Sequence, residues 1–199
     1  MWHLATFSEI GCGRHFRLIR VFAFATVIAV LQPPLVVGQV LLTQDEALRL
    51  AFPEPATIER RTAFLEQSQI DSVAMLAGSK PAGTLVTYYV GRSGSESLGA
   101  AYFDGHRVRT LPEVLMIVVT PGGRVERIEI LRFSEPREYM APDGWLDRFN
   151  EHHLDGDLEN KNAVAGITGA TLTSRAVTNA VRRTLALHEI LDPLGAGQP

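Results

Sequence analysis

The feature that most restricts the fold is a block of four strand-like segments between residues 84 and 133. Each segment is apolar or alternates apolar with charged residues, and the four are 84–91, 97–104, 113–120 and 124–133. A loop with Ser93-Gly94 joins the first two and "PGG" joins the last two, so each pair is predicted to form a β-hairpin. The third segment, "EVLMIVVT", is continuously apolar, which is typical of a strand inside a sheet. We therefore expect a central, mainly antiparallel sheet.

Helical patterns surround this block. Thr43-Gln44-Asp45-Glu46 is a capping-box sequence and predicts a short helix that ends near Ala51. A strand is expected over 57–65, and further helices are expected over 66–76, around 145–149 and over 173–191. Gly78 is expected to end the helix over 66–76, and the last helix is expected to carry an apolar stripe that includes Val177, Val181 and Leu185. The order of helices, antiparallel strands and helices indicates the α+β class, with the sheet flanked by helices. Because the sequence has no internal repeat, we expect a single domain.

The N-terminal region has the order of an export signal. Three arginines precede the uncharged apolar run 21–31, and small residues follow at 36–38, which is typical of a secretory signal peptide. If the apolar segment extended over 21–42, it would reach roughly 20 residues and could serve as a membrane anchor. Both alternatives place the rest of the chain outside the cytoplasm, because the arginines come first. We therefore expect a signal peptide or membrane anchor at 1–38, the folded domain at 39–192 and a flexible tail at 193–199.

The composition of the predicted domain excludes several function classes. Of the 19 Lys and Arg and the 22 Asp and Glu in the chain, three arginines and Glu9 precede Gln39, which leaves a net charge of −5 for residues 39–199. Nucleic acid is therefore not an expected partner, because binding it requires a basic surface. The one cysteine, Cys12, also precedes the domain, so disulfides, thiol chemistry and cysteine-ligated metals are excluded.

The sequence lacks the common hydrolytic and acyl-transfer motifs, because it contains no GxxxxGK[ST], HExxH or GxSxG. His152-His153 and the acidic residues after them are interpreted as a solvated loop rather than a metal site. His106 is expected at a turn or strand end with a hydrogen-bond partner, and His188 is expected to pack on the last helix. We therefore expect no metal site and no catalytic acid or base.

The stretch "GITGATLTSRAV", residues 166–177, places three threonines and a serine where the last helix is predicted to begin. Gly169 and Ala170 keep the backbone accessible and the surface low. The first turn of a helix has free N–H groups and a positive dipole end, which favour an anion such as a phosphate. Ordinary capping of the helix by Thr171 or Thr173 is the alternative. Spacing alone leaves both interpretations open.

The same stretch carries a resemblance to a known family. "TGATLTSRAV", residues 168–177, resembles the [S/T]GAT flavinylation motif of the FMN-binding domain in the periplasmic subunits of the Rnf complex and of the sodium-translocating NADH:quinone reductase. The similarity extends over roughly residues 51–191 and includes "RIEILRFSEPREY" before a segment that contains tryptophan. The resemblance implies a small exported FMN-binding protein.

In that family a flavin transferase joins FMN through its phosphate to the last threonine of the motif, which implies Thr171 here. The neighbours implied in phosphate binding or in recognition by the transferase are Thr168, Gly169, Ala170, Leu172, Thr173 and Ser174. Glu135, in a Glu-Pro turn, is similar to a turn that the family has near the flavin, and a purely structural turn is the alternative. The family usually has an acidic residue six positions before the modified threonine, where this chain has Ala165.

The function that the resemblance implies is electron transfer by an exported flavoprotein with FMN as its cofactor. The implied partners are a flavin transferase and redox proteins of the membrane or periplasm, and the implied location is periplasmic, with or without an anchor in the inner membrane. A redox carrier is favoured over a stand-alone enzyme. The alternatives are a flavin-free assembly or sensing module of the same fold and a flavin-dependent reductase of a small substrate.

Overall fold

The structure, a computed structural model, describes residues 39–154, 158 and 166–195. The predicted signal peptide or anchor, most of the acidic loop after Leu154, Ala165 and the end of the tail lie outside these residues. Within the described part of the chain, none of the helices has the length and apolar character needed to cross a membrane.

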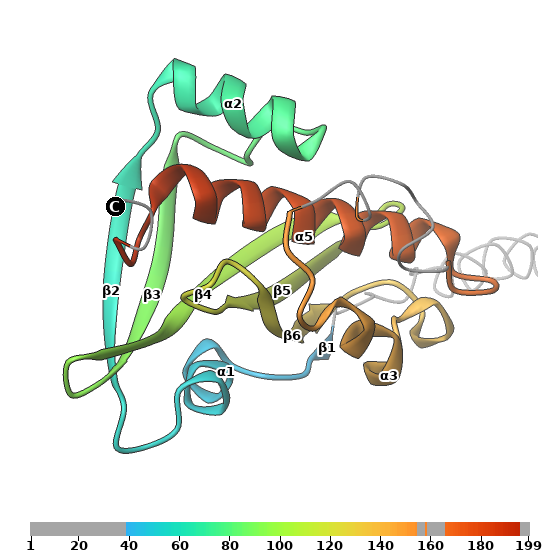
Figure 1. The fold of residues 1–199 in the computed structure, drawn as a ribbon. Coiled ribbons are helices and arrows are strands. Elements are labelled where there is room, and N and C mark those ends of the chain that lie inside the picture. The colour runs from blue at the N-terminus through green and yellow to red at the C-terminus, as the bar shows by residue number, and fades with distance from the viewer. Residues whose placement is uncertain (1–38, 155–157, 159–165, 196–199) are drawn as a thin grey trace, which may run out of the picture. The chain divides into compact units, whose positions relative to one another are not determined.

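The centre of the domain is a six-stranded antiparallel sheet, which confirms the predicted α+β class (Figure 1). The strand order is β1-β6-β5-β4-β3-β2, so each strand from β2 to β6 pairs with the next one in the sequence, and β1 lies at the edge beside β6. β5 lies inside the sheet, as its continuous apolar sequence predicts. The strands are β1 (Gln39–Val40), β2 (Thr57–Phe64), β3 (Leu85–Ser93), β4 (Glu96–Arg107), β5 (Pro112–Val119) and β6 (Val125–Phe133).

Helices cover both faces of the sheet (Figure 1). α5 lies across one face with α2 packed against it, and α1 lies on the opposite face. α3 and two short 3-10 helices, η1 and η2, follow β6. The helices are α1 (Gln44–Ala51), α2 (Gln67–Ala77), η1 (Arg137–Tyr139), α3 (Asp143–Leu146), η2 (Asp147–Phe149) and α5 (Thr171–Leu191).

The predicted ends of two helices are confirmed in atomic detail. At the start of α1, the Glu46 N–H donates to the Thr43 hydroxyl at 3.3 Å and the Thr43 N–H donates to the Glu46 carboxylate at 2.8 Å, which is the predicted capping box. α2 ends at Gly78, which has a left-handed φ of 69°. α5 begins at Thr171, slightly before the predicted residue 173.

The main core lies between the sheet and α5. The helix contributes the buried side chains of Val177, Val181 and Leu185, and the sheet contributes Leu115 and Ile117. These helix residues belong to the apolar stripe predicted for the last helix. Because burying one aliphatic side chain contributes about 1.5–3 kcal/mol, the stripe holds α5, including its first turn, in place on the sheet.

Sequence patterns do not predict β1 or η1. β1 consists of Gln39 and Val40, which pair with Phe133 and Arg132. A strand this short shows no alternation, and a single 3-10 turn such as η1 shows no periodicity. Both elements are therefore found only in the structure.

Gly91→Ala tests how α1 packs on the sheet. A Cβ at Gly91 would lie 2.2 Å from the ring of Phe52, a residue that is 2% exposed and directly follows α1. We expect the substitution to lower the free energy of unfolding by about 1–3 kcal/mol, because the ring must move to admit the methyl group. Gly105→Ala in β4 is the matched control, since a Cβ there would have no such neighbour within 4 Å. Urea denaturation followed by circular dichroism measures both, and equal effects would contradict this packing.

Candidate functional site

A pocket of about 250 Å³ lies where the first turn of α5 meets η1 and the turn between β4 and β5. The pocket brings together six residues predicted from the sequence, namely Glu135, Gly169, Ala170, Thr171, Leu172 and Thr173. Thr168 and Ser174, which were also predicted, flank this stretch and lie outside the lining. The other lining residues are Val108, Arg109 and Tyr139. Three segments that are far apart in the sequence therefore form one site.

Thr171 is the first residue of α5 and is exposed. The N-cap position is occupied by the buried Ala170, and no side chain caps the helix, so the interpretation of these threonines as ordinary caps is wrong. Gly169 has a φ of 83°, a left-handed conformation that favours glycine and turns the chain into the helix. Among the described residues, the Thr171 hydroxyl has no hydrogen-bond partner. A free and accessible hydroxyl therefore lies at the positive end of a long helix.

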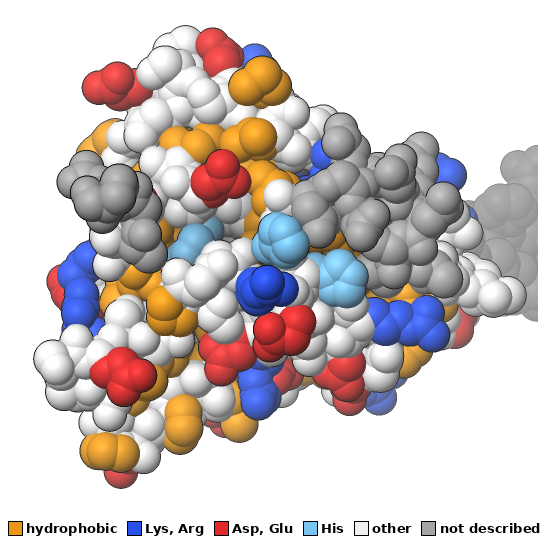
Figure 2. Space-filling model, viewed as in Figure 1, with side chains coloured by type: hydrophobic (Ala, Val, Ile, Leu, Met, Phe, Trp, Pro, Cys, Tyr) orange, Lys and Arg blue, Asp and Glu red, His pale blue; other side chains and the backbone are white. Residues whose placement is uncertain are grey.

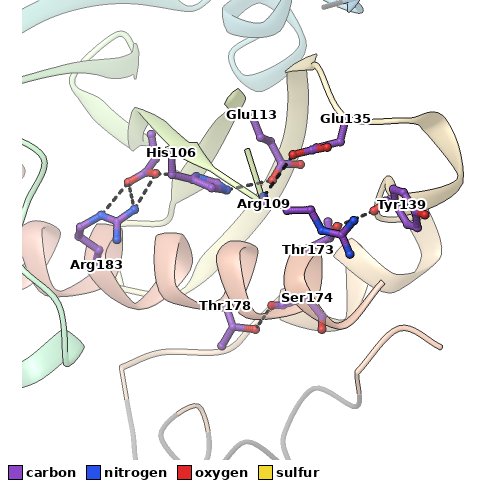
Figure 3. A network of polar contacts seen from close by, with 10 residues as sticks. His106, Arg109, Glu113, Glu135, Tyr139, Thr173, Ser174, Thr178 and Arg183 are labelled. Carbon is purple, nitrogen blue, oxygen red and sulfur yellow. Dashed lines mark hydrogen bonds and ion pairs between the residues drawn. The ribbon is translucent and has the colours of Figure 1, made fainter. Parts of the chain in front are cut away.

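The next two hydroxyls of the motif hold the fold together. Thr173 is 1% exposed, and its hydroxyl donates to the backbone oxygen of Tyr139 at 2.6 Å (Figure 3). Ser174 is 6% exposed, and its hydroxyl donates to the backbone oxygen of Thr171 at 3.0 Å. The Thr173 bond connects the first turn of α5 to η1, and the Ser174 bond lies within that turn. Because both hydroxyls already donate to backbone oxygens, the N–H groups of the first turn are the donors still available to an anion. A role of these two hydroxyls in phosphate binding stays a prediction.

Glu135 lines the pocket and also fixes the turn between β4 and β5. Its Oε1 accepts hydrogen bonds from the N–H groups of Thr110 at 2.7 Å, Leu111 at 2.8 Å and Arg109 at 3.3 Å, and from the Thr110 hydroxyl at 3.3 Å. The N–H of Thr110, followed by that of Leu111, lowers the pKa of Glu135, so the carboxylate is charged near neutral pH. The structure thus places Glu135 in the same pocket as Thr171 while its Oε1 is used to shape the pocket wall.

Sequence reasoning missed Arg109 and Tyr139. The guanidinium carbon of Arg109 lies 5.8 Å from the centre of the Tyr139 ring, which is the distance of a cation–π contact. Figure 3 shows both side chains beside the start of α5. No spacing in the sequence relates a turn residue at 109 to a 3-10 residue at 139, so neither could be found from the pattern.

Four charged side chains form a row between the sheet and α5, and Figure 3 labels three of them, His106, Glu113 and Arg183. Arg183 donates from Nε and Nη2 to the Asp104 carboxylate at 2.9 Å and 2.7 Å. His106 Nδ1 lies 2.9 Å from the same carboxylate, and its Nε2 lies 2.9 Å from Glu113 Oε2. Glu113 is fully buried. The expectation that His106 has hydrogen-bond partners at a strand end is confirmed.

The carboxylate neighbours keep His106 in its charged form. Burial by itself would lower the pKa of His106, but hydrogen bonds to Asp104 and Glu113 raise it to about 9. Burial would likewise raise the pKa of Asp104, yet hydrogen bonds from His106 and the charge of Arg183 lower it. At neutral pH the charged His106 therefore lies between Glu113 and the Asp104 carboxylate.

His188 on α5 is a buried packing residue, as the sequence predicts, and it contacts Tyr102 of β4. It is 8% exposed, and its Nδ1 lies 3.0 Å from the hydroxyl of Tyr102. Burial lowers the pKa of His188 to about 4, so this histidine is neutral near pH 7.

The stability of the fold should depend on pH through His106. Because its pKa rises from 6.5 to about 9 on folding, the stabilisation is fully present below pH 6.5 and is lost as the pH rises through 9. The shift corresponds to at most about 3 kcal/mol. Between pH 7 and about 10 the free energy of unfolding should fall more steeply for the wild type than for His106→Gln. The control His152→Gln should follow the wild type, and parallel curves for the wild type and His106→Gln would contradict the assignment.

Comparison with known proteins finds similarity to one family. The FMN-binding domain family matches residues 112–186, which include β5, β6, Glu135 and most of α5. A subunit of the Na(+)-translocating ferredoxin:NAD(+) oxidoreductase complex of Acetobacterium woodii is 24% identical over 160 residues, which cover 75% of each chain. The resemblance predicted from the motif is thereby confirmed. Residues 112–186 are therefore similar to the FMN-binding domain, and the cofactor that these matches indicate is FMN.

Proposed function

We propose that this protein is an FMN-binding electron-transfer component whose flavin is joined through its phosphate to Thr171. The observation that carries the proposal is the free Thr171 hydroxyl at the start of α5, in a pocket that also contains a cation and an aromatic ring. The Acetobacterium woodii relative is, by its name, part of a ferredoxin:NAD(+) oxidoreductase complex, which supports a role in electron transport.

The lining of the pocket fits FMN chemically. N–H groups in the first turn of a helix lack acceptors within the helix and lie at its positive end, so they suit the negative charge of a phosphodiester. Tyr139 and Leu172 offer an aromatic and an apolar surface to a planar ring, and Leu172 is 42% exposed. When bound, FMN supplies the redox chemistry, and the chain supplies attachment, orientation and local charge.

Attachment requires an FMN donor whose phosphate carries a leaving group, and a flavin transferase would provide it. The Thr171 hydroxyl loses its proton, the bond from Oγ1 to phosphorus forms and the leaving group departs, so the chain gains the mass of FMN less one water. Thr168, Gly169 and Thr171 are exposed, which suits access by a transferase. A covalent link also keeps the flavin at an effective concentration of order mM or above.

An exported location and redox partners at a membrane or in the periplasm belong to the same proposal. The arginines followed by an apolar run support export, and the relative belongs by its name to a Na(+)-translocating complex. The net charge of residues 39–199 favours a partner with a basic docking surface. On the face shown in Figure 2, acidic and basic side chains are interspersed, so on that face the steering charge is not gathered in one patch.

Thr171→Val should abolish covalent attachment and preserve the fold. Valine has a similar shape but lacks the reacting hydroxyl, and this hydroxyl makes no hydrogen bond to the described residues, so the free energy of unfolding should change by no more than about 0.5 kcal/mol. Co-expression with a flavin transferase, followed by fluorescence of the denatured band and intact mass, measures attachment.

Thr178→Val is the matched control for this test. It removes a hydroxyl from the same helix, one that donates to the backbone oxygen of Ser174 at 2.8 Å, and should leave labelling unchanged. Covalent flavin in Thr171→Val would refute the attachment site. A wild-type chain that stays unlabelled, under conditions that label another flavinylated family member, would refute covalent attachment.

Ala165→Asp should raise the rate or extent of labelling. The substitution restores the carboxylate that the family usually has six positions before the modified threonine, and Ala165 lies outside the described residues, so the expectation depends on sequence spacing alone. Val164→Asp adds the same charge one position earlier and is the control. Time courses of labelling compare the three chains, and the same rate for all of them would show that the transferase does not use this position.

A further inference from the structure

Two charged side chains, Glu135 and Arg109, line the pocket. They differ in the hydrogen bonds that their charged groups make to the described residues. The Oε1 atom of Glu135 already accepts three N–H groups and one hydroxyl of the β4–β5 turn. Arg109 forms no ion pair with any residue that the structure describes. The positive end of α5 and the guanidinium of Arg109 are therefore the positive groups of a pocket that also holds the Glu135 carboxylate.

The backbone that carries Arg109 is held on several sides. Its own N–H donates to Glu135, the N–H of Val108 donates to the backbone oxygen of Leu111 at 3.2 Å, and Arg107 Nη1 donates to the backbone oxygen of Thr110 at 3.1 Å. At the base of the turn, His106 on β4 pairs with Glu113 on β5. The starting point of the Arg109 side chain is therefore fixed.

The surface on which the guanidinium rests is also fixed. Arg109 lies over the ring of Tyr139, and the backbone oxygen of Tyr139 accepts the Thr173 hydroxyl of α5 at 2.6 Å. A planar cation stacked on an aromatic ring keeps its charge and most of its hydrogen-bonding edge available. The structure thus presents one oriented cation in the pocket whose lining includes Thr171 (Figure 3).

A flavin attached at this pocket would carry one permanent negative charge on its phosphodiester and a second one on its ring only when the ring is reduced. The phosphodiester is charged permanently, and the N–H groups of the first turn of α5 suit it. Reduction of the ring by two electrons from a redox partner and one proton from water leaves one additional negative charge on the ring. A cation near that ring stabilises the reduced form relative to the oxidised form and so raises the midpoint potential.

We infer that Arg109, held by Glu135 and stacked on Tyr139, faces the flavin ring and raises its midpoint potential. The inference depends on the proposed function, because it requires FMN to be bound beside Thr171. It assigns Arg109 to tuning of the redox potential, and it assigns Glu135 and Tyr139 to positioning the guanidinium.

Spectroelectrochemical titration of the flavin absorbance tests this assignment on the full flavin-loaded chain. Arg109→Gln should weaken binding of the reduced flavin relative to the oxidised flavin by about tenfold, which lowers the midpoint potential by about 30 mV for a two-electron couple. Arg109→Lys should retain most of the wild-type potential, because it keeps the charge. Arg60→Gln removes the same charge on β2, outside the pocket lining, and should leave the potential unchanged.

The outcomes separate this inference from the proposed function. If the wild type carries no flavin, the proposed function fails. If Arg109→Gln is loaded and has the wild-type potential, or if Arg60→Gln shifts the potential equally, the tuning role is overturned while the proposed function stands. Loss of flavin from Arg109→Gln, with normal loading of Arg60→Gln, would also overturn it, because it would place Arg109 at the attachment step.

Discussion

The packing of α5 along the sheet is the interaction on which the rest of the structure depends. Val177, Val181 and Leu185 are buried against the strands, and Arg183 adds a directed contact because its guanidinium binds the Asp104 carboxylate with two nitrogens. Because these contacts hold α5 along its length, they also hold its N-terminal end in place. The position of Thr171 at the pocket therefore follows from side chains that lie more than one turn further along the helix.

The buried charges set the register of the hairpin that forms the opposite wall. Burying His106 and Glu113 costs desolvation, and their attraction offsets this cost only when both partners are present with good geometry. These residues lie directly opposite each other on β4 and β5, at the base of the turn that Glu135 holds at its tip. A one-residue slip of either strand would move its member of the pair to the other face of the sheet and break the contact, so the ion pair favours the observed position of the turn.

Much of the fold was predictable because its signals are local. The apolar run of β5, the capping box at Thr43 and the stripe of α5 each lie within one element, and all three are confirmed. The pocket was predictable only where a motif marked it, at Thr171 and its neighbours and at Glu135. Arg109 and Tyr139 meet only after the sheet and α5 have packed, and nothing in either local sequence encodes that contact.

The structure separates hydroxyl groups that the sequence leaves equivalent. Thr173 and Ser174 are buried and donate to backbone oxygens, so removing either hydroxyl would disturb the start of α5 as well as any ligand. Thr171 is exposed and makes no hydrogen bond to the described residues, so its hydroxyl is available for reaction without cost to the fold. Arg109, which lies over the Tyr139 ring, comes from the β4–β5 turn, and its N–H donates to Glu135. The proposed attachment depends on the end of a helix and the proposed tuning on a clamped turn, and the two are linked where the Thr173 hydroxyl binds the backbone of Tyr139.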